Sequence, residues 1–299
     1  SGMGELHLEI AAYRMQEAKL KVKISRPIVI YRETISRNYS GPAIMGKSPN
    51  KHNRLWVTLE KLPNEVIEAI KQGKLSEMQS REEKRKILSK EFEWETEDAR
   101  NVVAIEGTNL LVNRIKGKQF VEEVLDHVKS GFREATHACI LAKEPAYGLK
   151  VNIEDIQVHE DPVHRGPAQI LPMTWRPIWC CFLLSEPTLL EPIISFECKV
   201  PNEFVSPVLT TIQKRRGRII EMPTEEDMVI IKAEMPVAES FGLADELRSS
   251  TQGRAFWATQ FSHWQTVPES LQPTVIEEIR KRRGLSQRPP RAEEFFERE

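Results

Sequence analysis

The residues of this sequence with the most reactive side chains lie together at positions 159–166, which read His-Glu-Asp-Pro-Val-His-Arg-Gly. So many ionisable groups in one segment do not fit a protein core. The segment could hold a metal ion through His159, Asp161 and His164, perform acid–base chemistry, or form an exposed tip that contacts a partner. Pro162 prevents a helix that would place both histidines on one face, and neither further ligands nor a nucleophile stand out. We therefore favour the exposed tip and assign no metal-binding or catalytic residue.

A second polar loop, at 51–54, precedes a strand-like segment at 54–61. Lysine and arginine pair with phosphates, whereas asparagine and histidine can bond to ribose and base groups. Aromatic residues, on which single-stranded bases stack, are not interleaved in either loop, so a structured RNA is favoured. Residues 280–283 are a third basic feature, or else the solvated last turn of a helix. The predicted RNA-contacting residues are Lys51, His52, Asn53, Arg54, His159, Asp161, His164 and Arg165.

Length and composition indicate a soluble globular chain of about two domains. The sequence has 299 residues, 40% hydrophobic and 29% charged, with a net charge of −1. The longest apolar run, 178–184, is too short to span a bilayer, and no signal peptide is visible. The 4 cysteines have no disulfide-framework spacing, which favours free thiols in the cytoplasm.

The periodicity of apolar residues predicts an α+β arrangement over 27–186. Strands are expected at 28–36, 43–47 and 54–61 and from 149, and helices at 63–72, 78–91, 119–137 and 168–184. The alternation changes phase between Ile153 and Ile156, which predicts a β-bulge near Asp155. Before this domain, residues 1–26 read as a helix over 4–18 and a strand over 20–24, the cut end of another domain.

The segment 187–267 has a more regular pattern. Strand, helix, strand, strand, helix and strand are predicted in turn at 194–200, 204–212, 218–222, 229–235, 240–249 and 255–261. This order is the split βαβ, or ferredoxin-like, pattern. A last helix is expected at 274–281, within a C-terminal segment of 268–299.

Motifs along the whole chain resemble the C-terminal part of the elongation factor 2 family, the archaeal and eukaryotic ribosomal translocases. The motifs occur in the family's order and are Gly2–Glu9, Tyr31–Thr34, Lys47–Arg54, His159–Gln169, Glu191–Ile193, Lys214–Gly217, Glu239–Gly242 and Phe261–Trp264. The resemblance implies a ribosomal-protein-S5-domain-2-like fourth domain at 27–186 and a ferredoxin-like fifth domain at 187–267. It also implies that 1–26 is the remnant of a ferredoxin-like third domain and that 268–299 packs on the fourth domain.

The resemblance implies a function in translocation. His164 falls where the family carries diphthamide, a modified histidine that is the target of ADP-ribosylating toxins, at a tip that enters the small-subunit decoding site. The implied partners are the ribosome at that site and at the large-subunit factor-binding region, the tRNA–mRNA duplex, the diphthamide-synthesis enzymes and such toxins. A cytoplasmic monomer is expected. His159, Asp161 and Pro162 would support and stiffen the tip loop.

The family's GTPase function is not expected in this chain. The sequence contains no Gly-x-x-x-x-Gly-Lys-Ser/Thr motif, so GTP and magnesium would belong to a domain outside it. The segment 175–181, with two tryptophans and a proline, departs from the small-residue helix expected behind the tip. Two alternatives stay open: a metal-dependent hydrolase using His159, Asp161 and His164, and an inert truncated paralogue.

Overall fold

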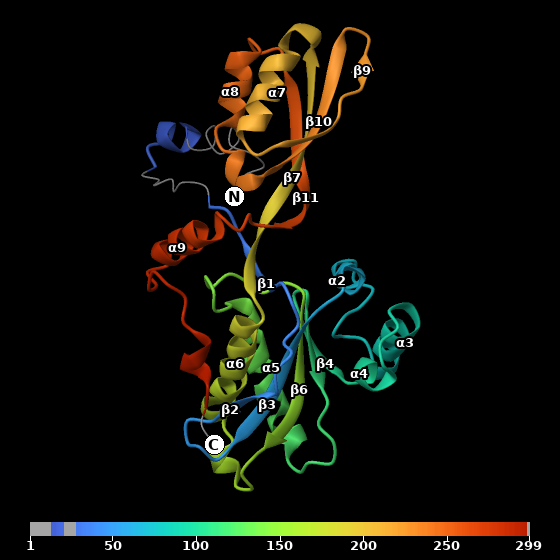
Figure 1. Ribbon diagram of the computed structural model, residues 1–299, viewed down its shortest axis with the longest axis vertical. Helices are drawn as coiled ribbons and strands as arrows, with labels where there is room; N and C mark the ends of the chain where they lie inside the picture. Colours follow the sequence, from blue (N-terminus) through green and yellow to red (C-terminus); the bar gives the residue numbers. More distant parts are fainter. Residues whose placement is uncertain (1–12, 21–27, 298–299) are drawn as a thin grey trace. The chain divides into compact units, whose positions relative to one another are not determined.

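The structure, a computed structural model, describes residues 13–20 and 28–297 (Figure 1). It consists of two compact units, one containing Glu191–Thr266 and the other Tyr31–Leu190 together with the segment from Val267. The predicted helix over 4–18 is described only from 13 onward, where 13–17 are helical. The predicted strand over 20–24, and with it the third-domain remnant, falls almost wholly outside the described residues. Among the described helices, none is long and apolar enough to span a membrane.

The larger unit is built on a five-stranded sheet with the strand order β2-β3-β6-β5-β4. Neighbouring strands are antiparallel except for β5 and β6, which are parallel. The predicted strand at 54–61 is confirmed, whereas the sequence does not predict the short hairpin of β4 and β5. The five strands are β2 (Ile44–Lys47), β3 (Arg54–Lys61), β4 (Val102–Glu106), β5 (Asn109–Asn113) and β6 (Leu149–Gln157).

Two helices, α5 (Val121–His137) and α6 (Pro167–Leu184), cover one face of this sheet (Figure 1). Their apolar stripes bury the inward-facing residues of β3 and β6, of which Leu55 and Val151 are fully buried. Close approach of α6 to β2 requires Gly46, because a Cβ there would lie 2.1 Å from the carbonyl oxygen of Met173. Helices α2 (Asn64–Lys71), α3 (Arg81–Glu91) and α4 (Thr96–Arg100) pack on a second apolar cluster beside β4 and β5.

The predicted β-bulge is confirmed in β6. Trp56 of β3 pairs with Asp155 and the next residue, Val57, pairs with Ile153, so Glu154 is the extra residue. An extra residue reverses the face to which the following side chains point. The bulge therefore re-aims the end of β6 just before the segment that contains His159.

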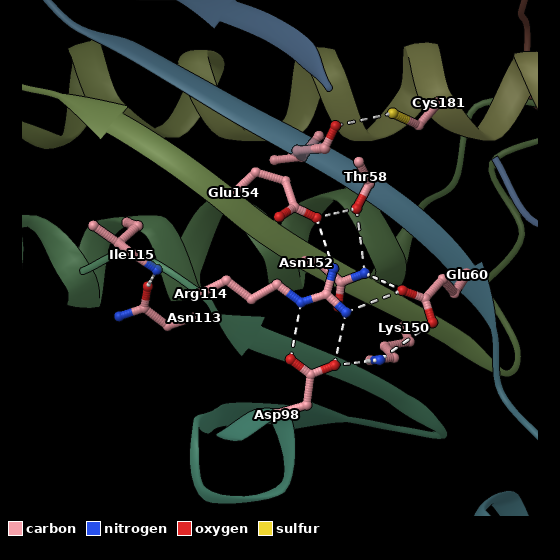
Figure 2. A network of polar contacts seen from close by, with 11 residues as sticks. Thr58, Glu60, Asp98, Asn113, Arg114, Ile115, Lys150, Asn152, Glu154 and Cys181 are labelled. Atoms are coloured by element: carbon pink, nitrogen blue, oxygen red, sulfur yellow. Dashed lines mark hydrogen bonds and ion pairs between the residues drawn. The ribbon is translucent and has the colours of Figure 1, made fainter. Parts of the chain in front are cut away.

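The other face of β3 and β6 carries a network of charged side chains centred on Arg114 (Figure 2). The Arg114 guanidinium donates two hydrogen bonds to the Asp98 carboxylate, at 2.9 and 2.7 Å, and one to Glu154 at 2.8 Å. Lys150 Nζ donates to Asp98 at 2.8 Å. Partial burial acts to raise the pKa of Asp98, but the Arg114 and Lys150 contacts outweigh it and lower this pKa to about 2. The network links both α4 and Arg114, the residue after β5, to strand β6.

The segment from Val267 belongs to this unit through α9 (Gln272–Arg282). Arg280 is 4% exposed, and its side chain donates to the carbonyl oxygens of Leu141 at 2.9 Å and Ser286 at 2.6 Å. Arg283 pairs with Glu144 at 2.7 Å. Arg280 therefore neither contacts nucleic acid nor belongs to a solvated last turn, because its guanidinium is buried and bound to carbonyl oxygens of the protein.

The aromatic residues of 175–181 have a structural role behind the tip. The Trp175 and Trp179 rings lie 4.5 Å apart, and Phe295 meets Trp179 edge to face at 6.0 Å. Arg176 also pairs with Glu297 at 3.1 Å. The C-terminal segment therefore packs along α6 at the position where the sequence departs from a small-residue helix.

The smaller unit confirms the predicted ferredoxin-like order. Its strands are arranged β11-β7-β10-β8, with α7 and α8 packed on one face over a core that includes Phe196, Val208 and Leu247. Arg216 forms two hydrogen bonds with the buried carboxylate of Glu191, at 2.9 and 2.8 Å. The elements are β7 (Pro187–Pro201), α7 (Val205–Lys214), β8 (Arg218–Glu221), β9 (Thr224–Glu225), β10 (Met228–Pro236), α8 (Leu243–Ser250) and β11 (Phe256–Thr266). In the larger unit, β1 (Arg32–Ile35) pairs with the first residues of β7.

Candidate nucleic-acid interface

The two polar loops emerge at the same edge of the five-stranded sheet. Arg54, the first residue of β3, pairs with Gln157, the last residue of β6. Because these strands are antiparallel, the loop before Arg54 and the segment after Gln157 meet at that edge (lower end of this unit in Figure 1). We call residues 47–54 the first tip loop and 158–166 the histidine loop.

Asn53 joins these two loops from inside the protein. It is 0% exposed, and its Nδ2 donates to the carbonyl oxygen of His164 at 2.8 Å. Its Oδ1 accepts the main-chain N–H of His159 at 3.0 Å. Asn50 adds a second donor to the same His164 carbonyl, at 3.1 Å, while its own N–H donates to Gln169 of α6 at 2.8 Å. One carbonyl of the histidine loop is thus held by two amides of the first tip loop.

The histidine loop also stabilises itself. Asp161 Oδ1 accepts the N–H of Val163 at 3.0 Å and caps a 3₁₀ turn at Pro162–His164. His159 Nδ1 accepts the N–H of Asp161 at 3.0 Å. Both side chains therefore hold the backbone of this loop in place, while Val163 projects with 82% of its surface exposed.

Three imidazole rings from the two loops form a cluster at the tip. The ring centroids of His52 and His159 lie 5.1 Å apart, those of His52 and His164 4.7 Å, and those of His159 and His164 4.6 Å. His52 is exposed, and the other two residues are half-buried. The sequence does not predict that His52 joins the two histidines of the other loop.

The described residues give no support to the alternative of a metal-dependent hydrolase at this site. Over residues 13–20 and 28–297, no group of three His, Cys, Asp or Glu side chains is placed to hold a metal ion. One atom of each of two proposed ligands instead binds the backbone of the loop: Asp161 Oδ1 accepts from Val163, and His159 Nδ1 accepts from Asp161.

Two cations of the first tip loop, Lys51 and Arg54, lie at the surface. Lys51 is exposed and Arg54 half-exposed, and neither forms an ion pair with another residue in the described part of the chain. Lys51 adopts a φ of 65°, in the left-handed region. Such uncompensated charges at a sheet edge are suited to anionic ligands.

Two of the predicted RNA-contacting residues need correction. Asn53 is completely buried, and Arg165 is 5% exposed. The Arg165 guanidinium lies over the Phe120 ring at 4.6 Å and pairs with Glu123 at 2.7 Å. These side chains position the loops from inside and lie too deep to contact RNA directly. Sequence reasoning also assigns no role to Asn50 or Gln169, which hold the same loops.

Comparison with known proteins identifies the relatives of both units. The family described as "Elongation factor G, domain IV" matches residues 74–186, and "Elongation factor G C-terminus" matches residues 188–275. Elongation factor 2 of Methanopyrus kandleri is 44% identical over 298 residues, covering 99% of this chain and 24% of that protein. Elongation factor 2 of Ignicoccus hospitalis is 44% identical over 299 residues, covering 99% of this chain and 40% of that protein.

A solved structure of a Thermus thermophilus protein has a TM-score of 0.66 and 25% identity, covering 94% of this chain and 36% of that one. The chain thus spans less than half the length of each of these relatives.

Proposed function

The chain belongs to the elongation factor 2 family of translation factors, and on that premise we propose that it is the ribosome-contacting part of a translocase. Its tip would hold the tRNA–mRNA duplex in the small-subunit decoding site during translocation. One observation supports this proposal above the others. Asn53 binds the carbonyl of His164 and so fixes two cation- and imidazole-bearing loops side by side.

The chemistry of the tip suits an RNA duplex. The minor groove of A-form RNA is wide and shallow and displays phosphates and ribose hydroxyls. Lys51 and Arg54 would pair with phosphates, and the imidazoles of His52 and His164 would reach hydroxyl or base groups. Because Asn53 and Asn50 hold the loops in one arrangement, little conformational entropy would be lost when the tip binds.

We propose His164 as the diphthamide position. Its carbonyl accepts from Asn53 and Asn50, while the residue remains half-exposed at the tip. The diphthamide-synthesis enzymes, and toxins that ADP-ribosylate the modified ring, would then act on this residue. Peptide mass spectrometry of the protein from its native source should detect an aminocarboxypropyl-type addition on His164; an unmodified histidine there would contradict the assignment.

The remaining activities of the family would require the rest of such a factor. GTP and magnesium binding, and hydrolysis, are proposed to lie in the part of the relatives that this chain does not cover. The large-subunit factor-binding region is proposed as the second ribosomal contact. The protein would act as a monomer in the cytoplasm, where translation takes place.

The proposed function is tested by salt-dependent binding to purified archaeal ribosomes. The slope of log affinity against log salt counts the phosphates neutralised, so Lys51→Ala with Arg54→Ala should reduce it by about 2. Lys71→Ala with Lys74→Ala is the matched control, because these lysines lie in and just after α2, away from the tip, in exposed ion pairs with Glu68 and Glu91.

Two results would count against the proposal. If the tip variant bound with the same affinity and slope as the control, the tip would not be the RNA contact. If the wild-type chain did not bind at all, it would behave as the inert paralogue.

A further inference from the structure

We infer that residues 114–120 form a third RNA-contacting element of the tip, in which Lys116 and Lys118 bind phosphates. This inference rests on the proposed function and extends its binding surface. The sequence does not single out the loop 114–120, because the hairpin of β4 and β5 that precedes this loop is not predicted. The structure places this loop beside the histidine loop.

The parallel pairing of β5 and β6 determines where the loop lies. Asn113, the last residue of β5, pairs with Ile153 of β6, and the N–H of Arg114 donates to the Ile153 carbonyl at 3.0 Å. Since parallel strands run in the same direction, residues 114–120 leave β5 towards the edge of the sheet where the histidine loop begins. Figure 1 shows this loop at the lower end of the unit, between β5 and α5.

Both lysines are accessible to a ligand. The Lys116 side chain is 73% exposed and pairs with Glu97, itself 56% exposed, at 2.7 Å. The Lys118 side chain is 41% exposed and pairs with Asp155, itself 42% exposed, at 3.3 Å. Exposed pairs of this kind contribute about 0–1 kcal/mol, so a phosphate can displace the carboxylate.

The loop is fixed at both ends. At its start, Arg114 is held by Asp98 and Glu154 in the network of Figure 2. At its end, Phe120 lies beneath the Arg165 guanidinium, and Arg165 directly follows His164. The two lysines are thus carried by a loop tied to the sheet on one side and to the histidine loop on the other. Between them, Gly117 has a φ of 62°, a conformation that glycine adopts without strain.

Lysine contacts of this type would set affinity without sequence preference. A lysine ammonium is a point charge that pairs with phosphate and does not read base edges. After a phosphate has displaced them from the lysines, the carboxylates of Glu97 and Asp155 stay nearby and repel that phosphate. Each of the two lysines should therefore contribute less to binding than Lys51 or Arg54, which have no acidic partner among the described residues.

Three double variants of the full chain test this inference with purified archaeal ribosomes. Lys116→Ala with Lys118→Ala should weaken binding about tenfold near 0.1 M salt and reduce the salt slope by about 1–2. Lys116→Arg with Lys118→Arg should retain wild-type binding. Glu97→Gln with Asp155→Asn should tighten binding, because it frees both lysines, and a gain in affinity does not arise from misfolding.

The possible failures are distinguishable. If Lys51→Ala with Arg54→Ala weakens binding while all three loop variants match the Lys71→Ala, Lys74→Ala control, the third element is refuted and the tip assignment stands. If the wild-type chain does not bind, or if changing Lys51 and Arg54 has no effect, the proposed function fails and this inference fails with it.

Discussion

The side-chain amide of Asn53 donates a 2.8 Å hydrogen bond to the main-chain carbonyl of His164, across a sequence separation of 111 residues. This bond lies inside the protein, since Asn53 is 0% exposed. It positions the histidine loop through its backbone and leaves the imidazole of His164 free for other contacts. The geometry of the tip therefore depends on a residue that no ligand can touch.

Replacing Asn53 should lower the stability of the tip without changing its charge. Asn53→Ala leaves the His159 N–H without an acceptor and the His164 carbonyl without one of its two donors, which costs roughly 1–3 kcal/mol of unfolding free energy. Ribosome affinity should fall, while the salt slope stays at the wild-type value because no charge is removed. Urea denaturation and salt-dependent binding measure the two effects.

Asn38→Ala is the control for this experiment. The Asn38 side chain accepts a 2.7 Å hydrogen bond from the N–H of Lys61 at the opposite end of β3, where water can replace it. Equal losses of ribosome affinity in the Asn38 and Asn53 variants would contradict a specific role for Asn53.

Arg165 should act through packing. Arg165→Met keeps a long side chain over Phe120 and should leave the salt slope of ribosome binding unchanged. Arg165→Ala removes that packing and should lower the unfolding free energy by about 2 kcal/mol or more. A decrease of the slope by about 1 in the Met variant would instead support a direct phosphate contact.

The Arg114 network predicts a specific acid sensitivity. Asp98 has a pKa of about 2 in the folded protein against an ordinary value of 3.8, so between these values the unfolded chain binds more protons. The corresponding stabilisation, about 2 kcal/mol, is complete above pH 4 and is lost as the pH falls towards 2. Urea midpoints between pH 3 and 6 should fall more steeply in the wild type than in Asp98→Asn; parallel curves would refute this assignment.

Arg280 should stabilise the protein without contributing to ribosome binding. Arg280→Met leaves the carbonyls of Leu141 and Ser286 without their charged donor and should cost about 2–3 kcal/mol. Lys281→Ala, at an exposed position of the same helix, should cost little and serves as the control. A reduced salt slope in the Arg280 variant, with unchanged stability, would contradict the buried role.

The sequence predicts elements whose pattern is local. The alternation of β3, the apolar stripe of α5 and the phase change at the β6 bulge can each be read from a short window of residues. The β4–β5 hairpin cannot, because each strand has only five residues and no strict alternation. Missing that hairpin also conceals the parallel pairing with β6 and the place of residues 114–120.

The site is predicted less completely because burial is not a local property. Asn53 and Arg165 are polar residues in loops, which normally indicates exposure. Their partners, however, are distant in the sequence. Asn53 binds His164, and Arg165 contacts Phe120 and Glu123. Only the folded arrangement reveals that the amide and the guanidinium face inward while Lys51 and Arg54 face water.

The division of the chain has a consequence for the order of assembly. The tip-bearing unit is interrupted after Leu190 and resumes at Val267, so in the sequence the ferredoxin-like segment Glu191–Thr266 separates its two parts. Synthesis proceeds from the N-terminus and domains generally fold as units. The nascent chain can therefore complete the ferredoxin-like unit while the tip-bearing unit still lacks α9. Arg280 can reach the Leu141 carbonyl only afterwards, so the tip-bearing unit is the later of the two to be completed.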